Sequence, residues 1–216
     1  MTDDVRMRSL TVDAGVVLSA DLGPAADWLR HGGIVAFPTD TVYGLAVDPR
    51  SADAVRALFD LKGRASQAAL PLIGDATATV VRACGPMDVR SARLAQVFWP
   101  GPLSIILDAP SDIVPEVHAG TGTVAVRVPA HRVARALASA YGGLITATSA
   151  NPSGQPPADR AAALDPIARD PRVFVVDAGA APGGAPSTIV DVRRGPPRVI
   201  REGAIAWNRV LESLQE

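Results

Sequence analysis

The chain has 216 residues, of which 48% are hydrophobic and 20% are charged, and its formal net charge is −1. This composition predicts a globular protein of one large or two small domains and excludes intrinsic disorder. The balanced charge and the pI near 6.3 exclude a protein held to nucleic acid mainly by bulk positive charge.

Helical and strand patterns alternate along the chain. In chain order, we predict a helix at 24–33, a strand at 34–37, a helix at 51–64, a strand at 70–73, a helix at 87–99, strands at 103–107 and 123–128, a helix at 131–143, strands at 144–149, 173–178, 187–192 and 198–201, and a helix at 206–215. This alternation predicts an α/β fold in which helices flank a mixed β-sheet. The segments 151–160 and 179–187 are predicted loops. No domain boundary is evident, so 1–216 is predicted to be a single domain.

The cellular compartment is predicted from two further features. One cysteine, Cys84, cannot form an intramolecular disulfide, which favours a reducing compartment. No signal peptide and no apolar run long enough to span a membrane are visible. We therefore expect a cytoplasmic protein with no membrane contact.

Several common motifs are missing. The sequence has neither a Walker loop nor a G-x-G-x-x-G fingerprint. His31, His118 and His131 are isolated from other metal-ligating residues, so no protein-bound metal is predicted. A Ser-His-Asp hydrolase lacks support because the sequence has no G-x-S-x-G elbow.

Polar residues gather instead at the ends of predicted strands. They occur in PTDTVYG (38–44), TVAVRVPAH (123–131), TATSANPSG (146–154) and APSTIVD (185–191). Taken singly, these segments are ordinary turn chemistry. Arg127 is less ordinary, because a charge in an apolar strand needs an anion or a fixed partner. Together the segments predict a site for an anionic ligand at one sheet edge.

Lys62 is the only lysine in the chain, and it lies two residues before Arg64. A compact ammonium fits between anionic oxygens where a planar guanidinium does not. We therefore expect Lys62 to have a specific role rather than to be a stray surface charge.

These segments resemble the YrdC/TsaC family, the threonylcarbamoyl-AMP synthases. The resemblance rests on PTDTVYGL, KGR, WPGPLS, TVAVRVP, SAN, STIVD and REGAI, in that order, over residues of about 20–206. It implies a single YrdC-like domain with a twisted mixed sheet and a concave basic cavity, without the C-terminal domain of longer members. It also implies a nucleotidyltransferase that condenses L-threonine, bicarbonate and ATP, with Mg²⁺ on the phosphates, to threonylcarbamoyl-adenylate and pyrophosphate.

The resemblance implies roles for individual residues. On the ATP side it places Lys62, Arg64, Thr123, Ser149, Asn151 and Arg201, and of these Lys62, Arg64, Ser149 and Asn151 are the expected catalytic residues. On the threonine side it places Thr41, Arg127 and Ser187, with Arg127 receiving the carboxylate. A downstream tRNA threonylcarbamoyl-transferase would use the product at A37 of tRNA, and contact with tRNA or double-stranded RNA is a further implied property.

The sequence departs from the family pattern near two of these motifs. Ala65, Ala68 and Ala69 stand where the pattern has Pro, Lys or Asn, and Pro, and Pro157 stands where it has Ser. Two polar contacts with the nucleotide are thereby lost, and each is expected to weaken binding by about 1–3 kcal/mol.

Two other functions are compatible with the sequence. One is a paralogue with an altered substrate and carbamoyl-adenylate-type chemistry. The other is a non-catalytic module that binds double-stranded RNA through a basic concavity, although the near-neutral charge does not favour it.

Overall fold

The strands of the protein are divided between two sheets. The computed structural model describes residues 8–63 and 68–215. Within these residues one sheet has five strands in the order β1-β9-β2-β3-β8, and the other has six in the order β11-β10-β5-β6-β4-β7. The α/β fold with mixed strands is as predicted, but the strands do not form one continuous sheet.

The five-stranded sheet is built from segments that are far apart in the sequence. Its strands are β1 (Arg8–Thr11), β2 (Ile34–Pro38), β3 (Tyr43–Ala46), β8 (Thr148–Ser149) and β9 (Val173–Asp177). β9 lies parallel to both β1 and β2, whereas β3 is antiparallel to β2 and to β8. The residues of β2 are all buried, as a continuous apolar run predicts for a central strand.

The six-stranded sheet carries most of the later motifs. Its strands are β4 (Leu72–Ile73), β5 (Leu103–Asp108), β6 (Thr123–Arg127), β7 (Ile145–Thr146), β10 (Thr188–Asp191) and β11 (Arg198–Arg201). β10 is parallel to β5 and antiparallel to β11. The strand predicted at 144–149 changes sheets at Ala147: β7 pairs with β4, and β8 pairs with β3.

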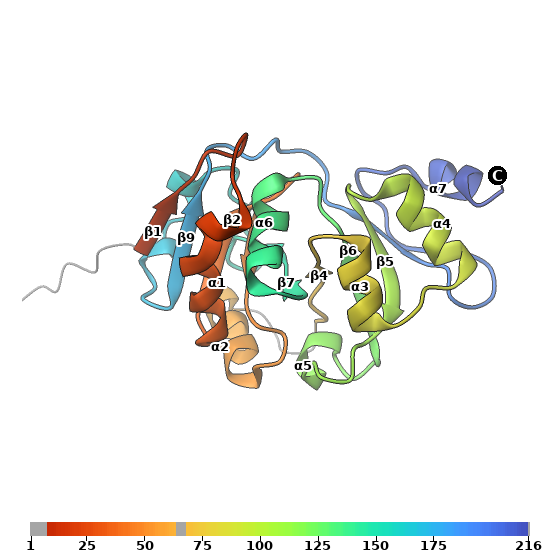
Figure 1. The fold of residues 1–216 in the computed structure, drawn as a ribbon, viewed down its shortest axis with the longest axis horizontal. Helices are drawn as coiled ribbons and strands as arrows, with labels where there is room; N and C mark the ends of the chain where they lie inside the picture. Colours follow the sequence, from red (N-terminus) through yellow and green to blue (C-terminus); the bar gives the residue numbers. More distant parts are fainter. Residues whose placement is uncertain (1–7, 64–67, 216) are drawn as a thin grey trace, which may run out of the picture.

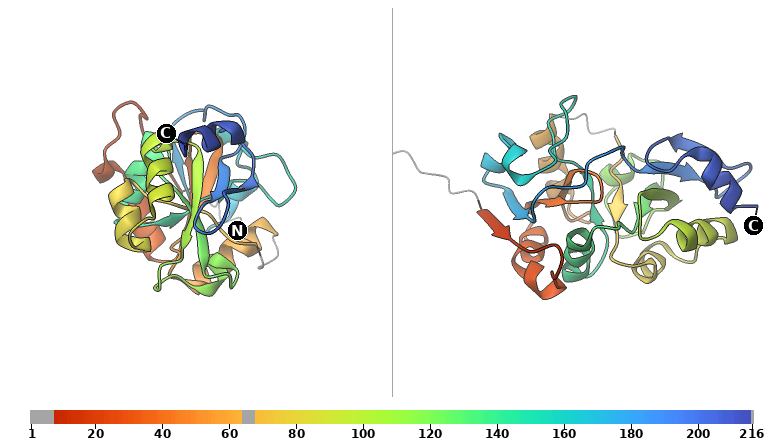
Figure 2. Two further views of the ribbon diagram at one scale, coloured as in Figure 1. Left: turned by 90° about the vertical axis from the view of Figure 1, so that its right-hand side faces the viewer. Right: turned by 90° about the horizontal axis from the view of Figure 1, so that it is seen from above.

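Helices cover the sheets and close one end of the molecule. They are α1 (Gly23–Arg30), α2 (Ala52–Lys62), α3 (Thr77–Cys84), α4 (Val89–Phe98), α5 (Pro115–His118), α6 (Arg132–Tyr141) and α7 (Trp207–Ser213). Figure 1 shows β1 and β9 at one end of the long axis and α4 and α7 at the other. Figure 2 shows from a second direction that α1 and α6 lie side by side. In the described part of the chain, no helix has the length and apolar character that crossing a bilayer requires.

Local sequence explains several helix ends. Ser51 caps α2 by accepting a hydrogen bond from the backbone N–H of Ala54, and Asp88 caps α4 in the same way. α2 ends where Gly63 adopts a φ of 58°, a left-handed conformation that glycine reaches without steric cost. This ending fixes Lys62 at the last position of the helix.

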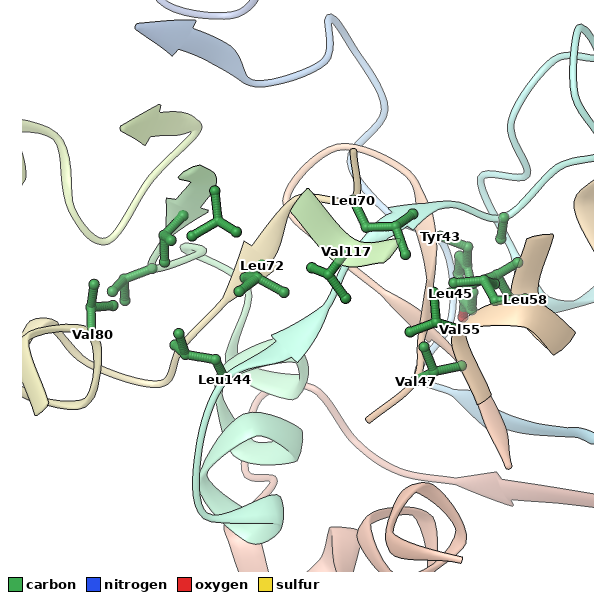
Figure 3. Close-up of a cluster of buried hydrophobic side chains, with 14 of the residues drawn as sticks. Tyr43, Leu45, Val47, Val55, Leu58, Leu70, Leu72, Val80, Val117 and Leu144 are labelled. Carbon is green, nitrogen blue, oxygen red and sulfur yellow. The ribbon is translucent and has the colours of Figure 1, made fainter. Parts of the chain in front are cut away.

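Two hydrophobic clusters hold the layers together. One lies between α1, α6 and the sheets and includes Leu29, Val35 and Leu137. The larger cluster unites side chains of both sheets, and Figure 3 shows Leu45 of β3 and Leu72 of β4 in it. Burial of apolar surface at about 25 cal/mol per Å² makes such clusters the main stabilising term. The two sheets are therefore one packed unit.

Candidate active site

A cavity of about 570 Å³ lies where strands of the two sheets meet. This volume is within the range of small-molecule sites. Its described lining residues come from the β2–β3 loop, from the strand ends and from the loops after them: Thr39, Thr41, Val42, Tyr43, Gly44, Ala69, Pro71, Arg127, Ala147, Thr148, Ser149, Pro157, Gly184, Pro186, Ser187, Ile189 and Arg201. Polar groups thus converge as predicted, but between the two sheets rather than at the edge of one.

The PTDTVYG segment forms a tightly bonded loop on one side of the cavity. The Thr39 hydroxyl donates to the Val42 carbonyl at 2.7 Å and lies 3.2 Å from the Thr41 hydroxyl. Tyr43, which follows Val42, donates its hydroxyl proton to the carbonyl of Gly179 at 2.8 Å. Burial raises the pKa of Tyr43 to about 12, so the phenol stays a neutral donor at physiological pH. The loop is therefore held from both of its ends.

Arg127 reaches the cavity from the last position of β6. Its Nη1 donates to Asp40 Oδ1, and the two side chains are only 9% and 11% exposed. The sequence predicted that this buried arginine needs an anion or a fixed partner, and Asp40 is that partner. Asp40 was not among the predicted site residues, although it stands within the predicted PTDTVYG loop.

Ser187 and Arg201 form another part of the cavity wall. Arg201 donates from Nη2 to the Ser187 carbonyl at 2.8 Å and to the Ser187 hydroxyl at 3.0 Å. The Ser187 hydroxyl is also 3.1 Å from that of Ser104, which belongs to the WPGPLS segment. A Cβ on Gly203 would lie 2.1 Å from the Pro186 carbonyl oxygen. The glycine of the REG motif therefore permits close packing against the backbone that carries Ser187.

The electrostatics of the two guanidinium groups are coupled. Arg201 as a whole is exposed, but lost hydration around its guanidinium and repulsion from Arg127 lower its pKa. The guanidinium remains cationic at neutral pH, since arginine is not deprotonated in proteins. Two neighbouring cations at one end of a cavity attract carboxylate or phosphate groups.

Lys62 lies behind the cavity wall and is 4% exposed. Its ammonium donates to the carbonyl of Ser149, to the carbonyl of Asn151 at 2.7 Å and to Asn151 Oδ1 at 3.4 Å. The Ser149 hydroxyl in turn donates to Asn151 Oδ1. The lysine thus lies between oxygen atoms, as expected of a compact ammonium. These oxygens belong to the SAN loop, residues 149–151.

The structure brings most of the predicted site residues together. Thr41, Arg127, Ser149, Ser187 and Arg201 line the cavity. Lys62 lies behind the cavity and donates to Asn151 of the SAN loop. Arg64 lies outside the described residues, as does Ala65.

Thr123 lies apart from this group. It begins β6, whereas Arg127 ends it, and a rise of about 3.3 Å per residue separates them by about 13 Å. Its hydroxyl is 3.2 Å from that of Thr121. Thr123 is not among the lining residues that the described chain contributes, so its role in ATP binding stays a prediction.

Two of the departures from the family pattern face the cavity. Ala68, where a polar contact was expected to be lost, is not among the described lining residues, but Ala69 and Pro157 both line the cavity. Neither has a polar side chain, so this part of the wall contributes apolar surface. The prediction that nucleotide contacts are weakened here remains open to measurement.

The histidines do not form a metal centre within residues 8–63 and 68–215. His131 is the histidine nearest to the cavity, at the start of α6, and its buried Nδ1 has no hydrogen-bond partner in the described chain. Burial lowers its pKa, against the opposing influence of the Asp40 charge. A neutral imidazole at this position does not compete with Arg127 for the Asp40 carboxylate.

Comparisons with known proteins agree with this arrangement. A family model described as "Telomere recombination", which groups Sua5, YciO and YrdC proteins, matches residues 27–203. The chain is 39% identical over 168 residues to a threonylcarbamoyl-AMP synthase of Thiobacillus denitrificans, covering 78% of this chain and 89% of that protein. It is 47% identical to one of Halorhodospira halophila, over 62% of this chain and 70% of that protein.

A solved structure extends the comparison to three dimensions. Sua5 of Pyrococcus abyssi, complexed with L-threonine, matches with a TM-score of 0.84 and 30% identity, over 95% of this chain. The present chain spans 60% of that longer protein. The fold, the order of the motifs and the family match agree, and the chain belongs to the Sua5/YciO/YrdC family.

Proposed function

We propose that the protein is a threonylcarbamoyl-AMP synthase, which condenses L-threonine, bicarbonate and ATP to threonylcarbamoyl-adenylate and pyrophosphate. The observation that carries this proposal is the pair of cations, Arg127 and Arg201, set among the hydroxyls of Thr41 and Ser187 in one cavity. The curated relatives bear the same activity in their names.

The threonine would bind at the Arg127 end. Arg127 would receive its carboxylate, and the hydroxyls of Thr41 and Ser187 would contact its polar groups. The presence of both hydroxyls in the cavity supports an amino-acid substrate over the alternative carbamoyl-adenylate-type chemistry. The solved P. abyssi relative carries L-threonine in its complex, which supports the same choice.

The ATP would enter as its Mg²⁺ complex on the side of the SAN loop. In the described chain, no carboxylate is among the lining residues, so the metal would arrive on the phosphates rather than on protein ligands. Ser149 and Arg201 would face the triphosphate, and Arg64 and Lys62 are the further cations that the family resemblance assigns there.

The reaction joins the three substrates in two steps. The threonine amine and bicarbonate give a carbamate with loss of water, and a carbamate oxygen then displaces pyrophosphate from the α-phosphorus. The residues of the cavity would contribute by positioning the substrates and by stabilising negative charge. Transfer of the product to tRNA by a partner enzyme, and contact with RNA, stay predictions.

The proposal is tested by release of pyrophosphate from ATP and Mg²⁺ with threonine or bicarbonate omitted in turn. We expect release to require both, and the adenylate to be detectable by mass spectrometry. Release that continues without threonine and bicarbonate would refute the proposal. Tight, salt-sensitive binding of duplex RNA without ATP binding would favour the RNA-binding alternative.

A further inference from the structure

Asp40 and Arg127 form a nearly buried ion pair at the wall of the cavity. Asp40 comes from the β2–β3 loop, and Arg127 comes from β6 in the other sheet. Arg127 lines the cavity, but Asp40 is not among the described lining residues. The second oxygen of Asp40 lies 3.4 Å from the backbone N–H of Ala130. The carboxylate therefore supports the guanidinium from behind.

The remaining donors of Arg127 determine what it can bind. Among the described residues, the only hydrogen bond of its guanidinium is the one from Nη1 to Asp40. No nitrogen of Arg127 is a buried atom without a partner in the same part of the chain. Its other guanidinium N–H groups are thus open to the cavity, and a guanidinium edge presents two parallel donors to a carboxylate.

Charge balance at this wall also depends on Asp40. Lost hydration lowers the pKa of Arg201, and the nearby positive charge of Arg127 lowers it further. Two cations and one carboxylate give this wall a net charge of about +1 by formal charges. This matches a ligand with one carboxylate, whereas two uncompensated guanidinium groups would favour a phosphate dianion.

We propose that Asp40 is a positioning residue that holds Arg127 with its free edge toward the cavity and tunes this wall to a single amino-acid carboxylate. The inference rests on the proposed function, because it assigns Arg127 to the threonine carboxylate. Asp40 does not touch the substrate itself. It acts through the guanidinium it holds.

The test measures the KM for threonine in the pyrophosphate-release assay for wild type, Asp40→Asn and Asp40→Glu. Asp40→Asn is expected to raise that KM about 10- to 100-fold while kcat and the KM for ATP change little. Competitive inhibition by inorganic phosphate against threonine is expected to strengthen. Asp40→Glu, which keeps the charge, is expected to recover most of the loss.

Asp191→Asn is the matched control. Asp191 is also a buried aspartate paired with arginines, Arg193 and Arg198, at the far end of β10 from Ser187. Its loss is expected to lower the unfolding temperature and leave the KM for threonine unchanged. An equal rise of KM in this control would overturn the proposal, as would an unchanged KM in folded Asp40→Asn.

A double variant tests the same proposal if Asp40→Asn fails to fold. Asp40→Asn with Arg127→Gln removes both charges, so no buried charge is left unpaired. It should show the same KM for threonine as Arg127→Gln alone, and a further rise would contradict action through Arg127. If wild type releases no pyrophosphate in response to threonine, it is the proposed function that fails instead.

Discussion

The two sides of the cavity are built in different ways. On the threonine side, Arg127 and Ser187 stand on or beside regular strands; Arg127 is fixed by Asp40, and Ser187 is fixed by Ser104 and Arg201. On the nucleotide side, Ser149 ends the two-residue strand β8 and Asn151 lies in the loop after it, and their polar groups bond mainly to one another and to Lys62. The first side is preorganised by the sheets, and the second depends on one buried ammonium.

Loss of Lys62 is expected to have the largest effect, because it removes the centre of the nucleotide side. Lys62→Ala leaves the carbonyl oxygens of Ser149 and Asn151 without their charged donor. We expect the free energy of unfolding to fall by about 2–4 kcal/mol and ATP affinity to fall about 100-fold. Calorimetric titration with ATP and thermal unfolding measure the two effects.

Two variants sharpen this test. Lys62→Arg keeps the charge but places a planar group at a residue that is only 4% exposed, so we expect it to lose most of the ATP affinity as well. Arg56→Ala, on the exposed face of the same helix, should leave ATP binding unchanged. Full ATP affinity in Lys62→Ala would show that the SAN loop does not depend on this ammonium.

Gly203→Ala tests how rigid the threonine side is. A Cβ would lie 2.1 Å from the Pro186 carbonyl oxygen and 2.8 Å from the Ser187 carbonyl carbon, so the backbone must move. Overpacking of this kind costs about 1–3 kcal/mol of unfolding free energy, and it should raise the KM for threonine more than that for ATP. Denaturant unfolding and steady-state kinetics measure these changes.

Gly23→Ala is the control, since a Cβ there meets no atom within 4 Å. It should leave both stability and kinetics close to those of wild type. A Gly203→Ala variant that behaves like this control would show that the segment carrying Ser187 adapts without loss, and the threonine side would not be preorganised as described.

The sequence predicted most of the strands and helices in their order, because apolar periodicity and capping residues are local signals, but it did not predict β1, β3 or α5. Ser51 and Gly63 mark the ends of α2 in the sequence as they do in the structure. The division into two sheets was not predicted. It depends on the change of sheet at Ala147 and on β9 pairing with β1, contacts between residues that are distant in the chain.

The candidate site shows the same limit. Strand-end position predicted the segments that contain Thr41, Arg127 and Ser187, and the family resemblance singled out these three residues. Partners that come from another motif were not predicted: Asp40 supports Arg127, and Ser104 supports Ser187. Lys62 was expected to meet anionic oxygens of a substrate, but its described contacts are with oxygens of the protein itself. Sequence spacing identifies strand ends, but it does not identify which polar groups meet across sheets.

Ser187→Ala is expected to have a smaller effect than Gly203→Ala. It removes a hydroxyl that meets both Ser104 and Arg201, while the bond from Arg201 to the Ser187 carbonyl remains. The loss of one hydrogen-bonding group costs about 1 kcal/mol, equivalent to about a fivefold rise in the KM for threonine. Steady-state kinetics with threonine varied measure it, with Ser104→Ala as the comparison. A larger effect from Ser104→Ala would make Ser104 the main contact.

Pro157→Ser is expected to have the smallest effect, and in the opposite direction. Pro157 lines the nucleotide side of the cavity and is where the family pattern has serine. A hydroxyl there adds one hydrogen-bonding group to a wall that Ala69 and Pro157 leave apolar, so ATP affinity should rise by about 0.5–1.5 kcal/mol. Calorimetric titration with ATP measures the gain, and Pro157→Ala separates the added hydroxyl from the loss of the ring. If serine and alanine give the same affinity, the hydroxyl does not reach the nucleotide. The nucleotide side would then depend on Lys62 and the SAN loop rather than on a hydroxyl at position 157.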